Sequence, residues 1–139
     1  MECFDPVRGK PVHETPEERV RQQIVAWLLE SVRVPRHLIQ VEFGLRAIQK
    51  GNPDRVDILV PQFRAGSPLS EPWLLVECKR PDKFTLADLQ VQVNRYLRVI
   101  RPLYIMLGLG DDRRFLKRTD DGKGYAPVET LPPYPVIPE

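Results

Sequence analysis

The chain has 139 residues, a formal net charge of +2 and 42% hydrophobic residues, which fits one domain with one packed core. A nearly neutral charge excludes a histone-like polycation, although a local basic patch would still suffice to bind nucleic acid. No apolar run is long enough to cross a membrane, and the first residues lack the pattern of a signal peptide. With two cysteines only, no disulfide framework is expected, and the predicted compartment is the reducing cytoplasm.

The first predicted elements are an arm and a helix. Residues 1–14 are polar with two prolines and predict a flexible N-terminal arm. Thr15, Pro16 and Glu18 are typical of a helix start, with Thr15 as N-cap and Glu18 completing a capping box. An apolar stripe at helical spacing then predicts a helix that continues to about residue 31.

Three strands are predicted after this helix. Residues 38–48 alternate imperfectly and residues 55–60 alternate between two faces, which predicts a strand in each segment. Residues 51–54 carry turn-forming residues between the two. Residues 73–79 form the most apolar strand-like run, and we expect this third strand to be central.

A strand–helix–strand unit is predicted next. Thr85 and Asp88 repeat the capping signal before an amphipathic helix of about four turns, and residues 103–109 form another apolar strand. Such a unit predicts a parallel pair of strands.

The remaining chain completes the predicted domain. We expect a short strand near residues 115–117 and an extended Pro-rich C-terminal tail, residues 127–139, outside the core. The predicted fold class is α/β, with residues 15–126 as a single domain.

The segment from Leu74 to Lys79 places charged residues in an apolar strand. Glu77 and Lys79 alternate to one face of this strand and Cys78 to the other. Burying such charges is costly unless they are paired or hold a metal. Asp57 on the neighbouring strand would bring a second carboxylate close to Glu77, and two close carboxylates raise each other's pKa unless a cation neutralises them.

These groups predict a metal site suited to phosphodiester hydrolysis. Oxygen-only ligands select a hard ion, so Asp57, Glu77 and the backbone carbonyl of Cys78 are the predicted ligands of Mg²⁺, with Mn²⁺ as a substitute. Lys79 would orient or deprotonate the attacking water, or stabilise the charge that develops at phosphorus. The alternative for an isolated Glu-x-Lys is a solvated strand end. Asp54 is the rival of Asp57, but its place in a turn explains an aspartate there.

Three segments carry a resemblance to a known family: Arg55–Val60, Leu75–Lys79 and Gln92–Tyr96. Together they resemble the PD-(D/E)XK nuclease superfamily, and most nearly the N-terminal nuclease domain of type I restriction enzyme R subunits. The resemblance spans about residues 15–110. It implies a restriction-endonuclease-like fold, with a central mixed sheet of four to five strands flanked by helices, and Mg²⁺-dependent cleavage of DNA.

The resemblance also implies roles for single residues. Asp57 and Glu77 would be metal ligands and Lys79 the catalytic lysine. Gln92 would lie close to the catalytic centre, one helical turn from Tyr96. The alternatives are an exposed polar residue for Gln92 and a core aromatic for Tyr96.

Two further carboxylates are candidates for the site. Some related nucleases use a glutamate of the first helix as an additional metal ligand, and Glu18 matches it in position, although a capping box would already explain this residue. Glu42 in the first predicted strand is the other candidate. His13 and His37 show no zinc-ligand spacing and receive no role. One metal ion and two metal ions both stay open.

The leading hypothesis is a Mg²⁺-dependent, restriction-enzyme-like DNA endonuclease. The alternative is a catalytically inactive nuclease-fold module that binds DNA or a partner protein, with the Pro-rich tail as a docking element. A nuclease for RNA or repair intermediates is a third option. The sequence contains no phosphate-binding loop of the ATPase type and no obvious sequence-reading motif. The expected partners are therefore DNA, a second copy of the chain, and a specificity or motor subunit.

Overall fold

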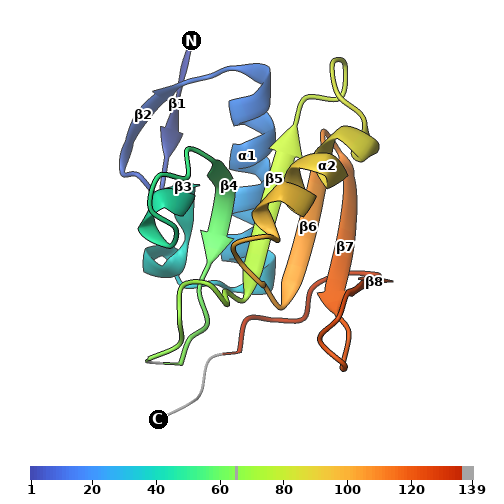
Figure 1. The fold of residues 1–139 in the computed structure, drawn as a ribbon. Coiled ribbons are helices and arrows are strands. Elements are labelled where there is room, and N and C mark those ends of the chain that lie inside the picture. The colour runs from blue at the N-terminus through green and yellow to red at the C-terminus, as the bar shows by residue number, and fades with distance from the viewer. Residues whose placement is uncertain (65, 136–139) are drawn as a thin grey trace.

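The computed structural model describes residues 1–64 and 66–135 as a mixed α/β structure. A six-stranded sheet forms its middle layer, and helices α1 and α2 cover opposite faces of this sheet (Figure 1). The strands follow the spatial order β3 (Gln40–Gly44), β4 (Arg55–Val60), β5 (Leu74–Lys79), β6 (Tyr104–Leu109), β7 (Asp112–Arg118) and β8 (Tyr125–Val128). No helix in the described part of the chain combines the length and apolarity needed to cross a bilayer.

The sheet topology confirms the predicted strand–helix–strand unit. β5 and β6 pair in parallel, with Glu77 beside Leu107, and every other neighbouring pair in the sheet is antiparallel. β5 lies between β4 and β6, as its apolar sequence predicts. The sheet has six strands where four to five were expected, because β8 was missed; β7 is also longer than predicted. β8 contains Pro127, which an edge strand tolerates since one side of its backbone makes no ladder bonds.

The C-terminal segment is not the isolated tail that its prolines suggest. It begins inside β8, and Leu131 and Tyr134 are buried in the core. The Tyr134 hydroxyl donates a hydrogen bond to the Pro61 carbonyl oxygen at 2.6 Å. Residues 136–139 of the predicted tail lie outside the described residues.

The helices begin where their capping signals predict. α1 (Pro16–Trp27) is capped by Thr15, whose hydroxyl accepts a hydrogen bond from the Glu18 backbone N–H at 3.0 Å. The helix continues through a π-helical turn, Leu28–Val32. α2 (Leu86–Tyr96) is shorter than four turns and has a complete capping box between Thr85 and Asp88.

Two hydrophobic clusters hold the three layers together. One cluster joins α1 to the sheet through residues such as Ile24, Ile58 and Met106. The other cluster joins α2 to the opposite face through residues such as Val93 and Leu75. The sheet therefore has no solvated face at its centre, which explains the almost wholly apolar sequences of β5 and β6.

The N-terminal segment corrects the prediction of a flexible arm. Residues 2–13 form an antiparallel hairpin of β1 (Glu2–Asp5) and β2 (Lys10–His13). The side chain of Asp5 is fully buried in the turn, where it accepts the Val7 and Arg8 backbone N–H groups and pairs with the Arg8 guanidinium. Local hydrogen bonds to a buried carboxylate give this polar segment its order.

The predicted strand at residues 38–48 is shorter in the structure. β3 is flanked by 3₁₀ turns at Arg36–Leu38 and Leu45–Ala47. Within β3, Glu42 has a φ of 54°, an uncommon conformation for a residue with a side chain. This irregularity explains the imperfect alternation of the sequence.

Candidate functional site

Asp57 lies where the β4–β5 ladder stops. The last recorded pair is Ile58 with Val76, and continuing this register by one residue would place Asp57 opposite Glu77. The Asp57 Oδ2 atom instead accepts the Cys78 backbone N–H at 2.8 Å. A side chain thus replaces the strand-to-strand bond at this point.

The strand alternation also breaks at Asp57. Val56 packs with the α2-side cluster, whereas Ile58 and Val60 pack with the α1-side cluster. Regular alternation would put all three on one face. The irregularity in β4 directs the Asp57 carboxylate toward β5.

Glu77 is the most buried charged residue of the predicted site, with 1% of its surface exposed. Its Oε2 atom has no hydrogen-bond partner within the described residues. Burial, a hydrogen bond with Asp57 and the charge of that carboxylate raise the pKa of Glu77 to about 9. Two carboxylates can share a hydrogen bond only when one is protonated, so the pair of Glu77 and Asp57 binds one proton more firmly than two separate carboxylates would.

Lys79 lies between acidic groups and an aromatic ring. Its Nζ atom is 2.7 Å from Glu17 Oε1 and 3.9 Å from Glu77 Oε1, and 5.5 Å from the centre of the Phe84 ring. Burial opposes its charge, but the hydrogen bond with Glu17 and the Asp57 carboxylate raise the pKa of Lys79 overall. Lys79 is therefore a charged donor at neutral pH.

A buried arginine contacts the predicted site from α1. The Arg21 side chain is only 8% exposed, and its Nη2 atom lies 3.8 Å from Asp57 Oδ1. It also lies 3.2 Å from Glu18 and 3.3 Å from Glu42. Arg8 of the hairpin pairs with Glu18 as well. The site thus has two arginines, neither of which the sequence argument identified.

Glu18 and Glu42, the two further candidate metal ligands, both lie near the site. In the structure they form ion pairs with Arg8 and Arg21. The Glu18 side chain does not close the expected capping box with Thr15; only the Thr15 half is formed. Paired charges cost less to bury than isolated ones, which explains why Glu18 turns inward toward arginine. Glu42 lies beside Arg21 through the left-handed turn of its backbone.

Gln92 and Tyr96 lie at different depths on α2. Tyr96 is buried, and its hydroxyl donates to the Arg55 carbonyl oxygen at 3.0 Å. Burial and the nearby Glu77 carboxylate raise the pKa of Tyr96. Gln92 lines the same groove as Lys79, and its Oε1 accepts from Arg95 at 3.2 Å.

Asp54 and the two histidines lie outside the site. Asp54 lies in the turn before β4 and pairs with Arg95 at 2.7 Å, which agrees with its expected role in the turn. His13 belongs to β2 and His37 to a 3₁₀ turn. The Cys78 thiol is buried, as predicted, and burial raises its pKa.

The acidic groups fit a cation site only in part. Across residues 1–64 and 66–135, no group of three or more carboxylate, histidine or cysteine side chains is arranged to hold a metal ion. The buried Glu77 carboxyl beside Asp57 nevertheless has one oxygen, Oε2, without a hydrogen-bond partner in these same residues. Mg²⁺ is commonly held by one or two carboxylates, with water and substrate phosphate completing its shell. The donors therefore fit an ion held by two carboxylates.

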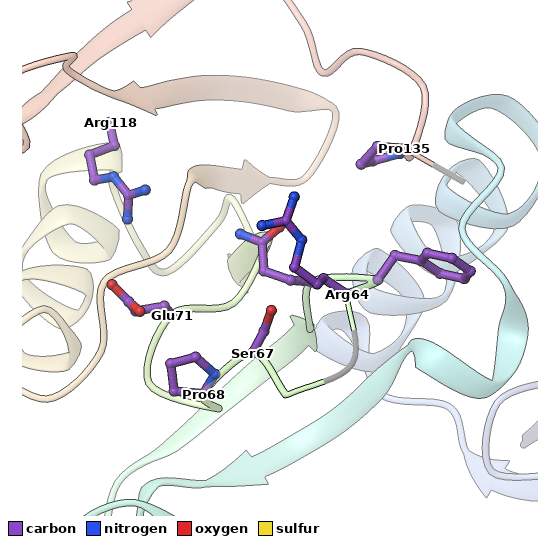
Figure 2. Close-up of a pocket in the computed structure, with 8 residues that line it drawn as sticks. Arg64, Ser67, Pro68, Glu71, Arg118 and Pro135 are labelled. Atoms are coloured by element: carbon purple, nitrogen blue, oxygen red, sulfur yellow. The ribbon is translucent and has the colours of Figure 1, made fainter. Parts of the chain in front are cut away.

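A hollow at another part of the sheet carries none of these residues. Figure 2 shows its lining, with Arg64, Glu71 and Arg118 around the opening. Arg118 ends β7, beyond Lys117, which pairs with the first residue of β6. Because β5 and β6 run in parallel, this end of the sheet lies opposite the Lys79 end.

The sequence did contain a pattern that could have identified Arg21 as a buried residue of the site. Arg21, Val25 and Leu28 recur at helical spacing, and all three are buried along α1 and the π-helical turn that continues it. A charged residue on an apolar stripe predicts a buried ion pair. Arg8 had no such signal, since its contacts depend on the hairpin fold.

Comparison with known protein families gives one match. Residues 16–132 match the family described as the type I restriction enzyme R protein N terminus. No curated protein and no solved structure matched the chain. The family match covers α1, the whole six-stranded sheet and every residue of the candidate site except Arg8, which lies in the hairpin of residues 2–13. The chain therefore belongs to the family of type I restriction enzyme R protein N-termini.

Proposed function

We propose that this protein is a Mg²⁺-dependent DNA endonuclease whose active site contains Asp57, Glu77 and Lys79. One observation carries the proposal: a buried Glu77 with an unpartnered oxygen lies beside Asp57, within 3.9 Å of the Lys79 ammonium. Buried carboxylate oxygens nearly always have a partner, and a bound metal ion would supply the one that Glu77 Oε2 lacks. The family match supports a role related to restriction enzymes, and we extend it to a restriction-endonuclease-like fold.

The proposed roles follow from the position of each group. Asp57 and Glu77 hold the metal ion, with the Cys78 carbonyl oxygen as a further ligand and Mn²⁺ as a substitute. A bound Mg²⁺ supplies Lewis-acid stabilisation of charge on the phosphoryl oxygens. Lys79 exchanges its contact with Glu17 for the scissile phosphate or the attacking water. Gln92, which lines the same groove as Lys79, positions the substrate strand.

Glu18 remains a candidate additional ligand under this proposal, with a structural cost. Its carboxylate is paired with Arg8 and Arg21, so binding a metal would leave both guanidinium groups without this partner. Arg21 keeps Asp57 and Glu42 as neighbours in either case. We therefore expect Glu18 to contribute less to metal affinity than Asp57 or Glu77.

The direct test compares cleavage by Lys79→Ala and by a control lysine variant. Supercoiled plasmid is incubated with Mg²⁺ and wild-type protein, Lys79→Ala, or Lys123→Ala, which changes an exposed turn residue. We expect wild type and Lys123→Ala to nick the plasmid and Lys79→Ala to lose at least 100-fold in rate, consistent with the roughly 10²–10³ cost of losing one charge-stabilising donor. Equal nicking by all three proteins would contradict the proposal.

A second test measures metal binding directly. A ligand that binds the folded form alone raises the melting temperature, so Mg²⁺ or Mn²⁺ should stabilise wild type but not Asp57→Asn. Glu71→Gln, in the hollow of Figure 2, is the matched control and should keep the shift.

The alternative is an inactive module of the same family that binds DNA or a partner subunit. One observation favours it: Lys79 is paired with Glu17 at 2.7 Å, which leaves its ammonium engaged before any substrate arrives. DNA binding that is unchanged by chelation, together with no cleavage of any DNA form, would support this module. Metal stabilisation that requires Asp57 would instead support the enzyme.

A further inference from the structure

A groove runs from Lys79 along the start of α2. Its lining includes Lys79 at the end of β5, Lys83 and Phe84 in the following loop, and Val91 and Gln92 on α2. In Figure 1 this loop follows the end of β5 and leads into α2, which crosses in front of the sheet. Lys79 belongs both to this groove and to the proposed site of cleavage.

The apolar part of this groove faces solvent. Phe84 has 37% of its surface exposed and Val91 has 62%, although large apolar residues favour burial. The Phe84 ring is held on one side by the Lys79 ammonium, 5.5 Å from the ring centre. An exposed aromatic ring fixed beside a lysine can stack on a planar ligand.

The polar part of the groove is cationic and can form hydrogen bonds. Lys83 makes no ion pair with any residue in the described ranges. The one carboxylate in the lining, Asp88, is engaged by the capping box, where it accepts the Thr85 backbone N–H at 2.8 Å. Gln92 also lines the groove, and its Oε1 atom accepts a hydrogen bond from Arg95. The lining thus combines an aromatic face, a free cation and an amide.

We propose that this groove binds an unpaired nucleobase of the DNA strand next to the scissile phosphate, with Phe84 as the stacking surface and Lys83 contacting the backbone. This inference rests on the proposed function for the identity of its ligand. Bases expose their faces only when they leave the duplex, since a duplex presents base edges and phosphates. Aromatic residues interleaved with lysines are the usual means of binding single strands. The predicted preferred substrate is therefore single-stranded, frayed or flapped DNA.

The test measures binding of a fluorescent 12-nucleotide single strand of mixed sequence, and of the same sequence as a duplex. Anisotropy titrations are done in EDTA at one fixed salt concentration, because phosphate contacts depend on salt. The proteins are wild type, Phe84→Ala, Phe84→Tyr and the control Phe63→Ala. Phe63 is 40% exposed and lines the distant hollow, so it matches Phe84 in type and exposure.

We expect Phe84→Ala to weaken single-strand binding by about 5- to 150-fold, the range that loss of one stacked base corresponds to. The affinity of Phe84→Ala for the duplex should differ from that of wild type by less than about twofold. Phe84→Tyr should retain most of the single-strand affinity, because tyrosine keeps a stacking face. Phe63→Ala should behave as wild type. The inference is wrong if Phe84→Ala weakens both DNA forms equally or neither, if Phe63→Ala has the same effect, or if wild type does not bind the single strand.

This experiment is separable from the test of catalysis. Binding in EDTA requires no cleavage, so the two experiments can fail independently. Equal nicking by wild type and Lys79→Ala would contradict the proposed catalysis but not the proposed base-binding site. Unchanged single-strand binding by Phe84→Ala would contradict the base-binding site but not the proposed catalysis.

Discussion

Replacing Glu77 with glutamine should stabilise the metal-free protein, and increasingly so as the pH rises. Glutamine has nearly the same shape and no charge, so Glu77→Gln removes the titration at this position. The pKa of this carboxyl is raised from 4.5 to about 9 in the folded protein. Between these two values the unfolded chain has released the proton and the folded protein still binds it. The unfolding free energy of wild type therefore falls as the pH rises through this window.

The magnitude follows from the width of that window. The contribution of Glu77 to stability is complete below pH 4.5 and is lost progressively up to about pH 9. Each pH unit within the window changes the unfolding free energy by about 1.4 kcal/mol. The unfolding free energy of wild type is thus about 3 kcal/mol lower at pH 7 than at pH 4.5 as far as Glu77 is concerned. This difference corresponds to about 10 °C in melting temperature for a domain of this size.

The assay is thermal or urea unfolding of wild type and Glu77→Gln between pH 5 and pH 8.5, with EDTA present. The difference in unfolding free energy between the two proteins should increase with pH. A constant difference over the whole range would refute the reasoning, because it would mean that Glu77 titrates normally in the folded state. Adding Mg²⁺ should reduce the difference, since a bound cation stabilises the charged carboxylate of wild type alone.

Three further predictions concern stability. Gly108→Ala should destabilise the protein by about 1–3 kcal/mol, because a Cβ atom there would meet the Ile24 terminal methyl at 2.6 Å; Gly124→Ala, with nothing within 4 Å, should have little effect in the same urea titration. Arg8→Ala should cost about 3 kcal/mol, because it leaves buried carboxylates without their partner; unchanged urea unfolding would show that the hairpin does not stabilise the site. Tyr134→Phe should cost about 1 kcal/mol by removing the hydrogen bond to the half-buried Pro61 carbonyl oxygen; an unaltered melting temperature would contradict a structural role for the C-terminal segment.

Periodicity in the sequence predicted the elements that are stabilised locally. β4 occupies the predicted residues 55–60, α2 begins after its predicted cap Thr85, and the β5–α2–β6 unit is parallel as expected. These elements have strong internal signals, because apolar spacing and capping act within a few residues of one another.

The elements that sequence reasoning missed are held by hydrogen bonds and strand pairing, which leave no periodic signal in the sequence. The hairpin of residues 2–13 is fixed by the local contacts of Asp5 and Arg8, and β8 exists because it can pair with the outer edge of β7. Neither segment has an apolar periodicity of its own. Proline in β8 argued against a strand, but the ladder with β7 outweighed that local signal.

For the site, the sequence by itself determined which strands carry the chemical groups. Asp57, Glu77 and Lys79 belong to two strands whose patterns are clear, so their place on neighbouring strands was predictable. Only the tertiary structure decided their electrostatic state. Burial of Glu77, the break in β4 at Asp57 and the buried Arg21 arise from packing between layers. Desolvation and charge pairing depend on distances across the fold, which no local pattern of residues specifies.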